Sequence, residues 1–225
     1  PIYNTDDDSL SGAEALIRWN SRKYGFIGPN TFIPLLEDSA LIIPLGRWII
    51  NTAAKACNRW ITSIPDFVMH INLSFVQIVK SNIVKDVLEN IERYSAANNH
   101  YVFEITETIE MDQIPAVQNV FKEFVKNEFR FAIDDFGTGY SNYGYMRDRT
   151  FDIVKVDRSF VTDIDKLKDN YLMVSFIIKM AHEMGLHVCI EGVETKEELS
   201  CVKKLGADYI QGYYYGKPVC LQDFE

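Results

Sequence analysis

The sequence predicts a single α/β domain in the form of a TIM-like (β/α)8 barrel. Short runs rich in β-branched residues alternate with amphipathic stretches, a pattern typical of a parallel sheet with crossover helices. There are about eight such runs, the number that closes a barrel of this kind. The chain has 225 residues, 47% of them hydrophobic, which is sufficient for one core of that size. An open doubly wound sheet would need a glycine-rich phosphate-binding turn after an early strand, and the sequence has none.

The expected strands can be placed in order along the chain. They cover residues 1–4, 13–19, 67–74, 101–107, 130–136, 151–157, 187–194 and 207–215. Amphipathic stretches at 46–63 and 170–185 predict helices, and the long segment 20–66 is expected to carry two helices. The acidic run at 4–9 predicts a solvated, hairpin-like turn.

The whole of 1–225 is expected to form one domain, with no linker or low-complexity segment inside it. The chain starts with Pro1, and a strand is already under way at Ile2. We therefore expect this chain to be a piece of a longer, multidomain protein, with part of the N-terminal edge of the domain missing.

Composition narrows the class of protein. The net charge is −9 and no run of Lys or Arg is present, so binding to a nucleic-acid polymer is not expected. The four cysteines form no Cys-x-x-Cys pair and the four histidines have no metal-ligand spacing, which favours reduced thiols and structural histidines in a cytoplasmic protein. The longest apolar stretch is broken by Pro44 and Arg47, so it is not expected to span a membrane, and no direct membrane contact is expected of residues 1–225.

Polar side chains recur late in the predicted strands, about one βα unit apart after a first, longer gap. They are Glu14, Asn72, Glu104, Asp134, Lys155, Glu191 and Gln211. In a barrel this places all seven at the C-terminal mouth, where barrel enzymes keep their active sites. One such residue would be explained by contact with water, but seven on successive strands indicate a site.

Four carboxylates and one amide oxygen of this set, together with the neighbouring carboxylate of Asp135, predict a metal centre. The ligands would be Glu14, Asn72, Glu104, Asp134, Asp135 and Glu191, and hard oxygen ligands favour Mg²⁺ or Mn²⁺. Six ligands exceed what one Mg²⁺ ion usually takes from protein, so we expect two ions roughly 3.5–4 Å apart. Asp134 would bridge both ions and Asp135 would reach one, while Gly137 and Gly139 allow the chain to turn sharply after them.

A two-metal centre predicts cleavage of a phosphate ester, and two basic residues suit that reaction. By the two-residue period of a strand, Glu14, Leu16 and Arg18 share a face, so Arg18 could hold a phosphate near the metal; a surface salt bridge is its alternative role. Lys155 and Asp157 also share a face. Lys155 could orient or deprotonate the attacking water, although a purely structural contact with Asp157 stays open.

Taken together, the motifs of the chain resemble those of the EAL-domain phosphodiesterases. They are "GAEALIRW", "NLS", "FEITET", "DDFGTGYS", "VKVDRSF", "IEGVET" and "QGYYYGKP", which run from the first strands to the last. The resemblance implies a barrel whose first strand is antiparallel to the others. It also implies hydrolysis of one phosphodiester of cyclic di-GMP, a bacterial second messenger, to linear pGpG, with Mg²⁺ or Mn²⁺ required and Ca²⁺ inhibitory. Ala40 departs from the glycine common at that position, with little effect expected.

Position by position, the resemblance assigns the same six residues to metal ligation and gives roles to others. Lys155 and Glu191 correspond to the residues that handle the nucleophilic water, and Leu16, Arg18, Asp157 and Gln211 are expected to contact substrate. Glu107 corresponds to the anchor of the "DDFGTG" loop, in which Gly137, Thr138 and Gly139 make a movable element, and Glu194 belongs to the supporting residues. The resemblance further implies a homodimer and covalently linked GGDEF or sensory domains, beneath a membrane in some relatives.

Three other functions fit the sequence less well. Relatives that act as cyclic di-GMP receptors or interaction modules usually lack a metal carboxylate, the lysine or an intact loop, and this chain has all of them. An enolase-type lyase typically uses one essential metal and three carboxylates, which leaves the adjacent Asp134 and Asp135 unexplained. A sugar hydrolase with Glu104 and Glu191 as its acid pair explains neither Asn72 nor Arg18.

Overall fold

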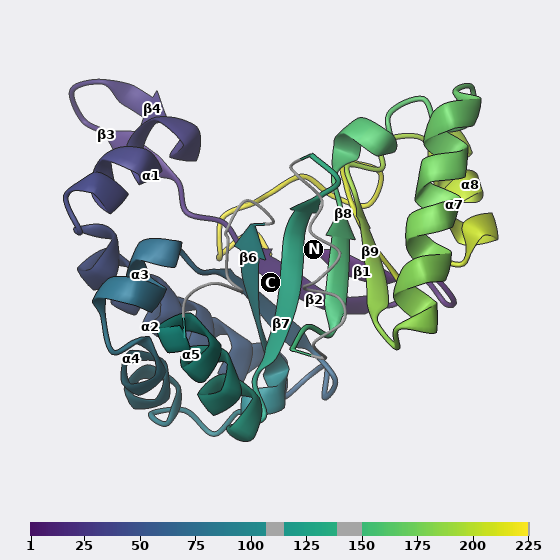
Figure 1. Cartoon of the computed structure of the whole chain (residues 1–225). Coiled ribbons are helices and arrows are strands. Elements are labelled where there is room, and N and C mark those ends of the chain that lie inside the picture. The colour runs from purple at the N-terminus through teal and green to yellow at the C-terminus, as the bar shows by residue number, and fades with distance from the viewer. Residues whose placement is uncertain (107–114, 139–149, 225) are drawn as a thin grey trace.

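The β-branched runs of the sequence pair into a closed barrel. The computed structural model describes residues 1–106, 115–138 and 150–224, and within these residues eight strands close the barrel (Figure 1). In their order around the barrel the strands are β1 (Ile2–Asn4), β10 (Tyr209–Gln211), β9 (His187–Glu191), β8 (Ile153–Val156), β7 (Arg130–Phe136), β6 (Tyr101–Thr106), β5 (Val68–Asn72) and β2 (Leu10–Ala15). The predicted (β/α)8 barrel is confirmed.

The first strand differs in direction from the rest. β1 is antiparallel to both of its neighbours, β2 and β10, and the other adjacent pairs are parallel. The acidic run at 4–9 is the short connection that allows this reversal, because β1 ends at Asn4 and β2 begins at Leu10. The expected antiparallel first strand and hairpin-like turn are therefore confirmed.

The helices lie outside the strands, as Figure 1 shows, with α2 to α5 on one side and α7 and α8 on the other. Their bounds are α1 (Pro29–Asp38), α2 (Ile42–Trp60), α3 (Phe75–Lys80), α4 (Ile83–Ile91), α5 (Pro115–Lys126), α7 (Lys168–Glu183) and α8 (Lys196–Leu205), with short 3-10 helices η1 (Asn98–His100) and η3 (Arg158–Phe160). In the described residues no helix combines the length and apolar character that a bilayer span requires.

The segment 20–66 carries the two expected helices, α1 and α2, and also a feature that was not expected. A two-stranded antiparallel hairpin, β3 (Trp19–Ser21) and β4 (Gly25–Ile27), precedes α1 and lies away from the barrel (Figure 1). Its strands have three residues each, too short for a period of two to be recognised in the sequence.

The barrel has two cores that meet at the strands. The larger core lies between strands and helices and includes Phe103, Phe131 and Ile133. The smaller cluster lies on the opposite face of the strands, in the interior of the barrel, and contains Ile2, Val102, Ala132, Ile153 and Cys189.

The smaller cluster shows that the polar residues near the strand ends face the interior of the barrel. Since side chains two apart in a strand share a face, the residues that follow this apolar layer also face the interior. Glu104, Asp134, Lys155 and Glu191 stand two positions beyond Val102, Ala132, Ile153 and Cys189, respectively. Inside the barrel, the layer nearer the N-terminal ends of the parallel strands is therefore apolar, and the layer at the C-terminal mouth is charged.

Asp208 joins two elements at the opposite end of the barrel from the mouth. Its carboxylate accepts hydrogen bonds from Val188 N (2.7 Å) and His182 Nε2 (2.8 Å) and lies 3.3 Å from His187 Nδ1. Burial alone would raise the pKa of Asp208, but the hydrogen bonds from His187 and His182 outweigh it and lower the pKa to about 2. The same contact raises the pKa of His187.

We predict that Asp208→Asn changes the pH dependence of stability. Because the folded-state pKa of Asp208 is depressed, its contribution is present above the unfolded value of about 3.9 and is lost as pH falls through about 2. The contribution of His187 is present below about 6.5 and is lost as pH rises through its raised pKa. After allowance for screening of these half-exposed groups, the variant should be about 1 kcal/mol less stable at pH 6. Urea unfolding from pH 2 to 9 measures this difference, and a difference independent of pH would contradict the prediction.

Candidate active site at the barrel mouth

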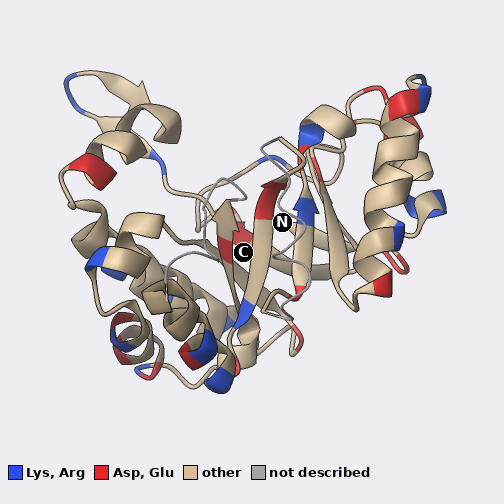
Figure 2. Cartoon of the chain, in the orientation of Figure 1, with Lys and Arg blue, Asp and Glu red and all other residues tan. Residues whose placement is uncertain are grey.

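Seven neighbouring strands each bring one of the predicted polar residues to the mouth of the barrel. Glu14 is on β2, Asn72 on β5, Glu104 on β6, Asp134 on β7, Lys155 on β8, Glu191 on β9 and Gln211 on β10. The pairing places Asn72 beside Glu104 and Gln211 beside Glu191. Figure 2 shows acidic segments on β6 and β7 and a basic segment on β8 at this end of the barrel.

Lys155 lies at the centre of the site and contacts four carboxylates. Its Nζ is 2.8 Å from Glu104 Oε2, 2.8 Å from Glu191 Oε1, 3.0 Å from Asp134 Oδ1 and 3.5 Å from Glu14 Oε2. The lysine is fully buried. Burial by itself lowers the pKa of an ammonium group, but the charges of Glu104, Glu14, Glu191 and Asp134 outweigh it and raise the pKa of Lys155 well above its usual value.

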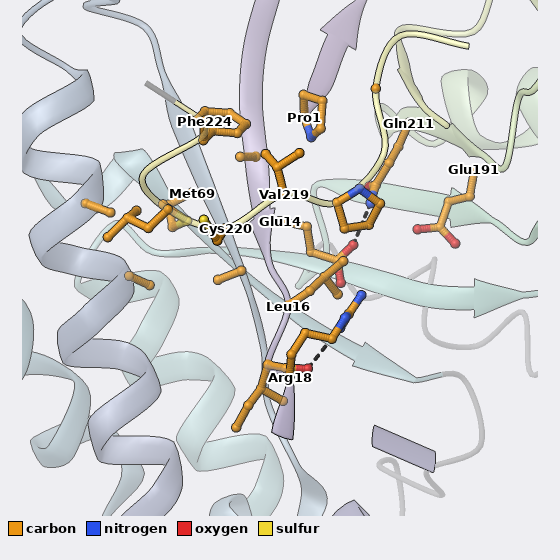
Figure 3. Close-up of a pocket in the computed structure, with 18 of the residues that line it drawn as sticks. Pro1, Glu14, Leu16, Arg18, Met69, Glu191, Gln211, Val219, Cys220 and Phe224 are labelled. Atoms are coloured by element: carbon orange, nitrogen blue, oxygen red, sulfur yellow. Dashed lines mark hydrogen bonds between the residues drawn. The ribbon is translucent and has the colours of Figure 1, made fainter. Parts of the chain in front are cut away.

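Glu14 joins the two ends of this arc of strands. Its Oε1 accepts a hydrogen bond from Asn72 Nδ2 (2.6 Å) and its Oε2 accepts one from Gln211 Nε2 (2.8 Å; Figure 3). Burial would raise the pKa of Glu14, but the charge of Lys155 and these two hydrogen bonds lower it to about 2. Glu14 is therefore an ionised carboxylate held in a fixed orientation.

A bulge in β7 explains how the side chains of two adjacent aspartates both reach the mouth of the barrel. Ile133 pairs with Val154 and Phe136 with Val156, so three steps along β7 match two steps along β8. Ile133 and Phe136 both pack in the helix-facing core, and the extra residue between them is Asp135, at φ 53°. Without this bulge Asp134 and Asp135 would point to opposite faces of the sheet. With it, ligand atoms of Asp134, Asp135 and Glu191 lie within 4.8 Å of one another.

The turn after the bulge requires glycine at one position. Gly137 has φ 97°, and a Cβ placed there would lie 2.6 Å from the ring of Phe160. Thr138 then folds back, and its backbone N–H and its hydroxyl both donate to the carbonyl of Asp135. The expected sharp turn is present at Gly137 and Thr138, whereas Gly139 lies outside the described residues.

The acidic groups around Lys155 are crowded, and their pKa values reflect this. Burial and the charge of Glu14 raise the pKa of Glu104 well above its usual value. Burial, reinforced by the charge of Asp134, also raises the pKa of Glu191 and of Asp135. One ammonium group therefore does not neutralise this cluster.

Unsatisfied oxygen atoms at the site suit a cation. Within the part of the chain that the structure describes, Gln211 Oε1 is buried without a hydrogen-bond partner, and the buried Glu104 Oε2 and Asp134 Oδ1 share one partner, Lys155 Nζ, at 2.8 and 3.0 Å. Buried oxygens without donors are costly unless a positive charge approaches them. The donor set consists of carboxylate and amide oxygens, which fits hard divalent cations.

A pocket of about 640 Å³ opens beside these carboxylates. Glu14, Leu16, Arg18, Asp157, Glu191, Glu194 and Gln211 are among the residues that line it. Figure 3 shows Leu16 and Arg18 beside Glu14, with Met69, Val219 and Phe224 on the apolar side of the pocket. The volume is within the range of small-molecule binding sites.

The predicted strand at 13–19 was too long. β2 ends at Ala15, so Leu16 and Arg18 follow the strand and do not extend its inward face. Both line the pocket all the same, and Arg18 Nη1 donates to the carbonyl of Ile17 at 2.9 Å while its side chain stays exposed.

Three other predicted residues have structural contacts or no described position. Asp157 lines the pocket and caps η3 by accepting a hydrogen bond from Ser159 N at 2.9 Å. Glu194 Oε1 lies 3.7 Å from Arg158 Nη2. Glu107 lies outside the described residues.

Two residues of the site were not recognised in the sequence. His70 Nδ1 lies 2.8 Å from Glu104 Oε1; burial, aided by the charge of Lys155, lowers the pKa of His70 to about 3, so the imidazole is neutral. Glu198 accepts hydrogen bonds from the backbone N–H groups of Asp163, Glu194 and Thr195, which ties two loops of the mouth together. Thr195 and Glu198 have the spacing of a helix capping box, which was the available signal for the second residue.

A family model described as "EAL domain" matches residues 1–218. The chain belongs to the EAL domain family. It is 32% identical to "Cyclic di-GMP phosphodiesterase PdeL" of Escherichia coli, over 97% of this chain and 61% of that protein. Two solved structures match over all of this EAL domain. "PaMucR Phosphodiesterase, c-di-GMP complex" has a TM-score of 0.93 and 29% sequence identity, and the match covers 92% of that chain. "Structure of EAL Enzyme Bd1971 - cAMP and cyclic-di-GMP bound form" has a TM-score of 0.92 and 35% sequence identity, and the match covers 62% of that chain.

This EAL domain is shorter than several of its relatives. It is 34% and 33% identical to uncharacterized proteins of Synechocystis and Sinorhizobium fredii and covers 97% of its own length in both matches. It spans only 32% and 26%, respectively, of the length of those two proteins.

We predict that Gly137→Ala destabilises the EAL domain by more than the backbone conformation alone requires. Gly185, at φ 79°, is a matched control, because a Cβ there meets no atom of the described residues within 4 Å. Gly185→Ala should cost about 1 kcal/mol, and Gly137→Ala should cost a further 1–3 kcal/mol, roughly, because the ring of Phe160 must move. Denaturant unfolding of both variants measures the difference. Equal losses would show that the contact with Phe160 does not hold this turn.

Proposed function

We propose that this EAL domain hydrolyses one phosphodiester bond of cyclic di-GMP and releases linear pGpG. The observation that carries the proposal is the convergence of five carboxylates and Lys155 at the barrel mouth, beside a pocket that Arg18 also lines. Related proteins support the choice of substrate, because PdeL is named a cyclic di-GMP phosphodiesterase and the MucR structure is described as a complex with this dinucleotide.

We propose that two divalent cations, Mg²⁺ or Mn²⁺, work at this site. With all five carboxylates ionised as metal ligands, the one ammonium group leaves four negative charges, which two divalent cations would balance. The residues that would hold the cations are Glu14, Asn72, Glu104, Asp134, Asp135 and Glu191. When bound, such ions neutralise the phosphate oxygens and lower the pKa of a water molecule. Ca²⁺ prefers longer bonds and more ligands than Mg²⁺, so we expect it to inhibit.

The residues of the chain would share the other tasks of the reaction. Lys155, as an ammonium group, would orient the attacking water, and Glu191, whose Oε1 lies 2.8 Å from Lys155 Nζ, would take up its proton. Arg18 would hold a phosphate through its guanidinium group. Leu16, Asp157 and Gln211 would contact the remainder of the dinucleotide from the wall of the pocket.

A cyclic di-GMP receptor without turnover is the alternative, and one assay separates the two functions. The purified domain is incubated with cyclic di-GMP and Mn²⁺, and products are resolved by chromatography. Formation of pGpG supports hydrolysis. Tight binding without product supports a receptor, and absence of both would reject a role in cyclic di-GMP signalling.

We predict that Asp134→Asn lowers turnover by more than about 100-fold, since it removes a charged ligand from the centre of the site. Asp152→Asn is the matched control: Asp152 accepts a hydrogen bond from Phe131 N at the other end of the barrel, which an amide oxygen can also accept. Initial rates at saturating Mn²⁺ measure both variants. Near-normal turnover of Asp134→Asn would contradict a centre with two cations.

We also propose that the domain acts in the cytoplasm as part of a longer protein with a GGDEF or sensory domain. The domain spans only 32% and 26% of the length of the Synechocystis and Sinorhizobium fredii proteins, which supports a longer protein. A GGDEF domain is supported by "Bifunctional diguanylate cyclase/cyclic di-GMP phosphodiesterase MucR" of Pseudomonas aeruginosa, which is 31% identical over 93% of this chain.

A homodimer is the expected assembly, with the segment after Asp135 coupling dimer geometry to the metal site through Gly137, Thr138 and Gly139. Sedimentation at micromolar concentration should then give twice the mass of the chain. Glu107→Ala is expected to weaken dimerisation or activity while the fold stays intact. A wild-type monomer at all concentrations would contradict this expectation.

A further inference from the structure

His70 lies beneath the metal ligands, in the interior of the barrel. It is the third residue of β5, two positions before Asn72, and it pairs in register with Glu14 on β2 and Val102 on β6. Only 4% of His70 is exposed. A buried imidazole at this level is thus surrounded by the strands that carry the site.

The two oxygens of the Glu104 carboxylate have different partners. Nδ1 of His70 lies 2.8 Å from Oε1, whereas Oε2 lies 2.8 Å from Lys155 Nζ. When Glu104 is a metal ligand it must be ionised, and Nδ1 then carries the hydrogen, because two acceptors at this distance would repel each other. His70 therefore donates to one oxygen and leaves the other directed at the centre of the mouth.

We propose that His70 is a positioning residue that fixes the carboxylate of Glu104 so that Oε2 faces the cation site. This inference rests on the proposed function. Rotation about the last bond of a glutamate side chain is broad and roughly two-fold, so without a partner on Oε1 the carboxylate would sample several orientations. Partners that orient metal ligands typically contribute 10–100-fold to metal affinity or activity.

Two nearly isosteric variants isolate the hydrogen bond from packing. His70→Leu removes the donor, whereas His70→Asn places an N–H at the same number of bonds from Cβ as Nδ1. Ile71→Val is a control on the same strand, because Ile71 packs in the helix-facing core and not in the barrel interior.

Mn²⁺ affinity of the metal-free protein is measured by calorimetry, and kcat and KM for cyclic di-GMP are measured separately. We expect His70→Leu to weaken Mn²⁺ binding by about 10–100-fold and to lower kcat, with KM for the dinucleotide little changed. We expect His70→Asn to recover most of both losses, and Ile71→Val to resemble the wild type in Mn²⁺ affinity and kcat.

The outcomes distinguish this inference from the function beneath it. Wild-type Mn²⁺ affinity and kcat in His70→Leu would overturn the positioning role alone. Equal losses in folded His70→Leu and His70→Asn would also overturn it, since packing would then explain the effect. If His70→Leu does not fold, retention of Mn²⁺ affinity in His70→Asn supports the role and its loss refutes it. Failure of the wild type to bind Mn²⁺ would reject the metal centre itself, and the positioning role with it.

Discussion

The contact of one buried ammonium with four carboxylates is the interaction on which the rest of this structure depends. A fully buried lysine is costly unless it is paired, and a group of buried carboxylates is costly unless positive charge lies among them. Lys155 and its partners satisfy both conditions only because β2, β6, β7, β8 and β9 all end at the same mouth. The barrel is therefore what makes the charged centre possible. The apolar layer beneath it, formed by Val102, Ala132, Ile153 and their neighbours, provides the packing that supports the strands.

Such a charged centre favours the binding of charged ligands. The lysine offsets only part of the negative charge, because its single ammonium group is shared among Glu104, Asp134, Glu14 and Glu191. Cations fit the remaining oxygens, and the adjoining pocket with Arg18 fits an anionic molecule that contacts those cations. The proposed metal binding and the proposed substrate binding would therefore both depend on the excess negative charge of the mouth. The cations would bind to that charge, and the anionic substrate would bind to the cations.

Much of the site follows from the sequence because barrel topology converts spacing along the chain into closeness in space. A polar residue at the C-terminal end of a barrel strand reaches the same mouth wherever that strand lies in the sequence, so Glu14 and Gln211 could be predicted to lie close together from the sequence alone. The bulge at Asp135 is different, because it depends on how β7 pairs with β8, and pairing register is not written in either strand alone. The end of β2 at Ala15 has a similar origin, since the apolar residues that follow it continue the pattern of a strand. His70 could be read only as a polar residue in an apolar strand, and its contact with Glu104 depends on the registers of β5 and β6.

Diffraction from crystals grown with Mn²⁺, recorded at its absorption edge, tests the central claim most directly. If the acids of the mouth form a two-cation centre, two anomalous peaks roughly 3.5–4 Å apart should lie within bonding distance of Asp134, with the other ligand oxygens around them. Lys155 should remain beside the site. A mouth without anomalous density, or Mn²⁺ bound only to acids elsewhere on the molecule, would contradict this account.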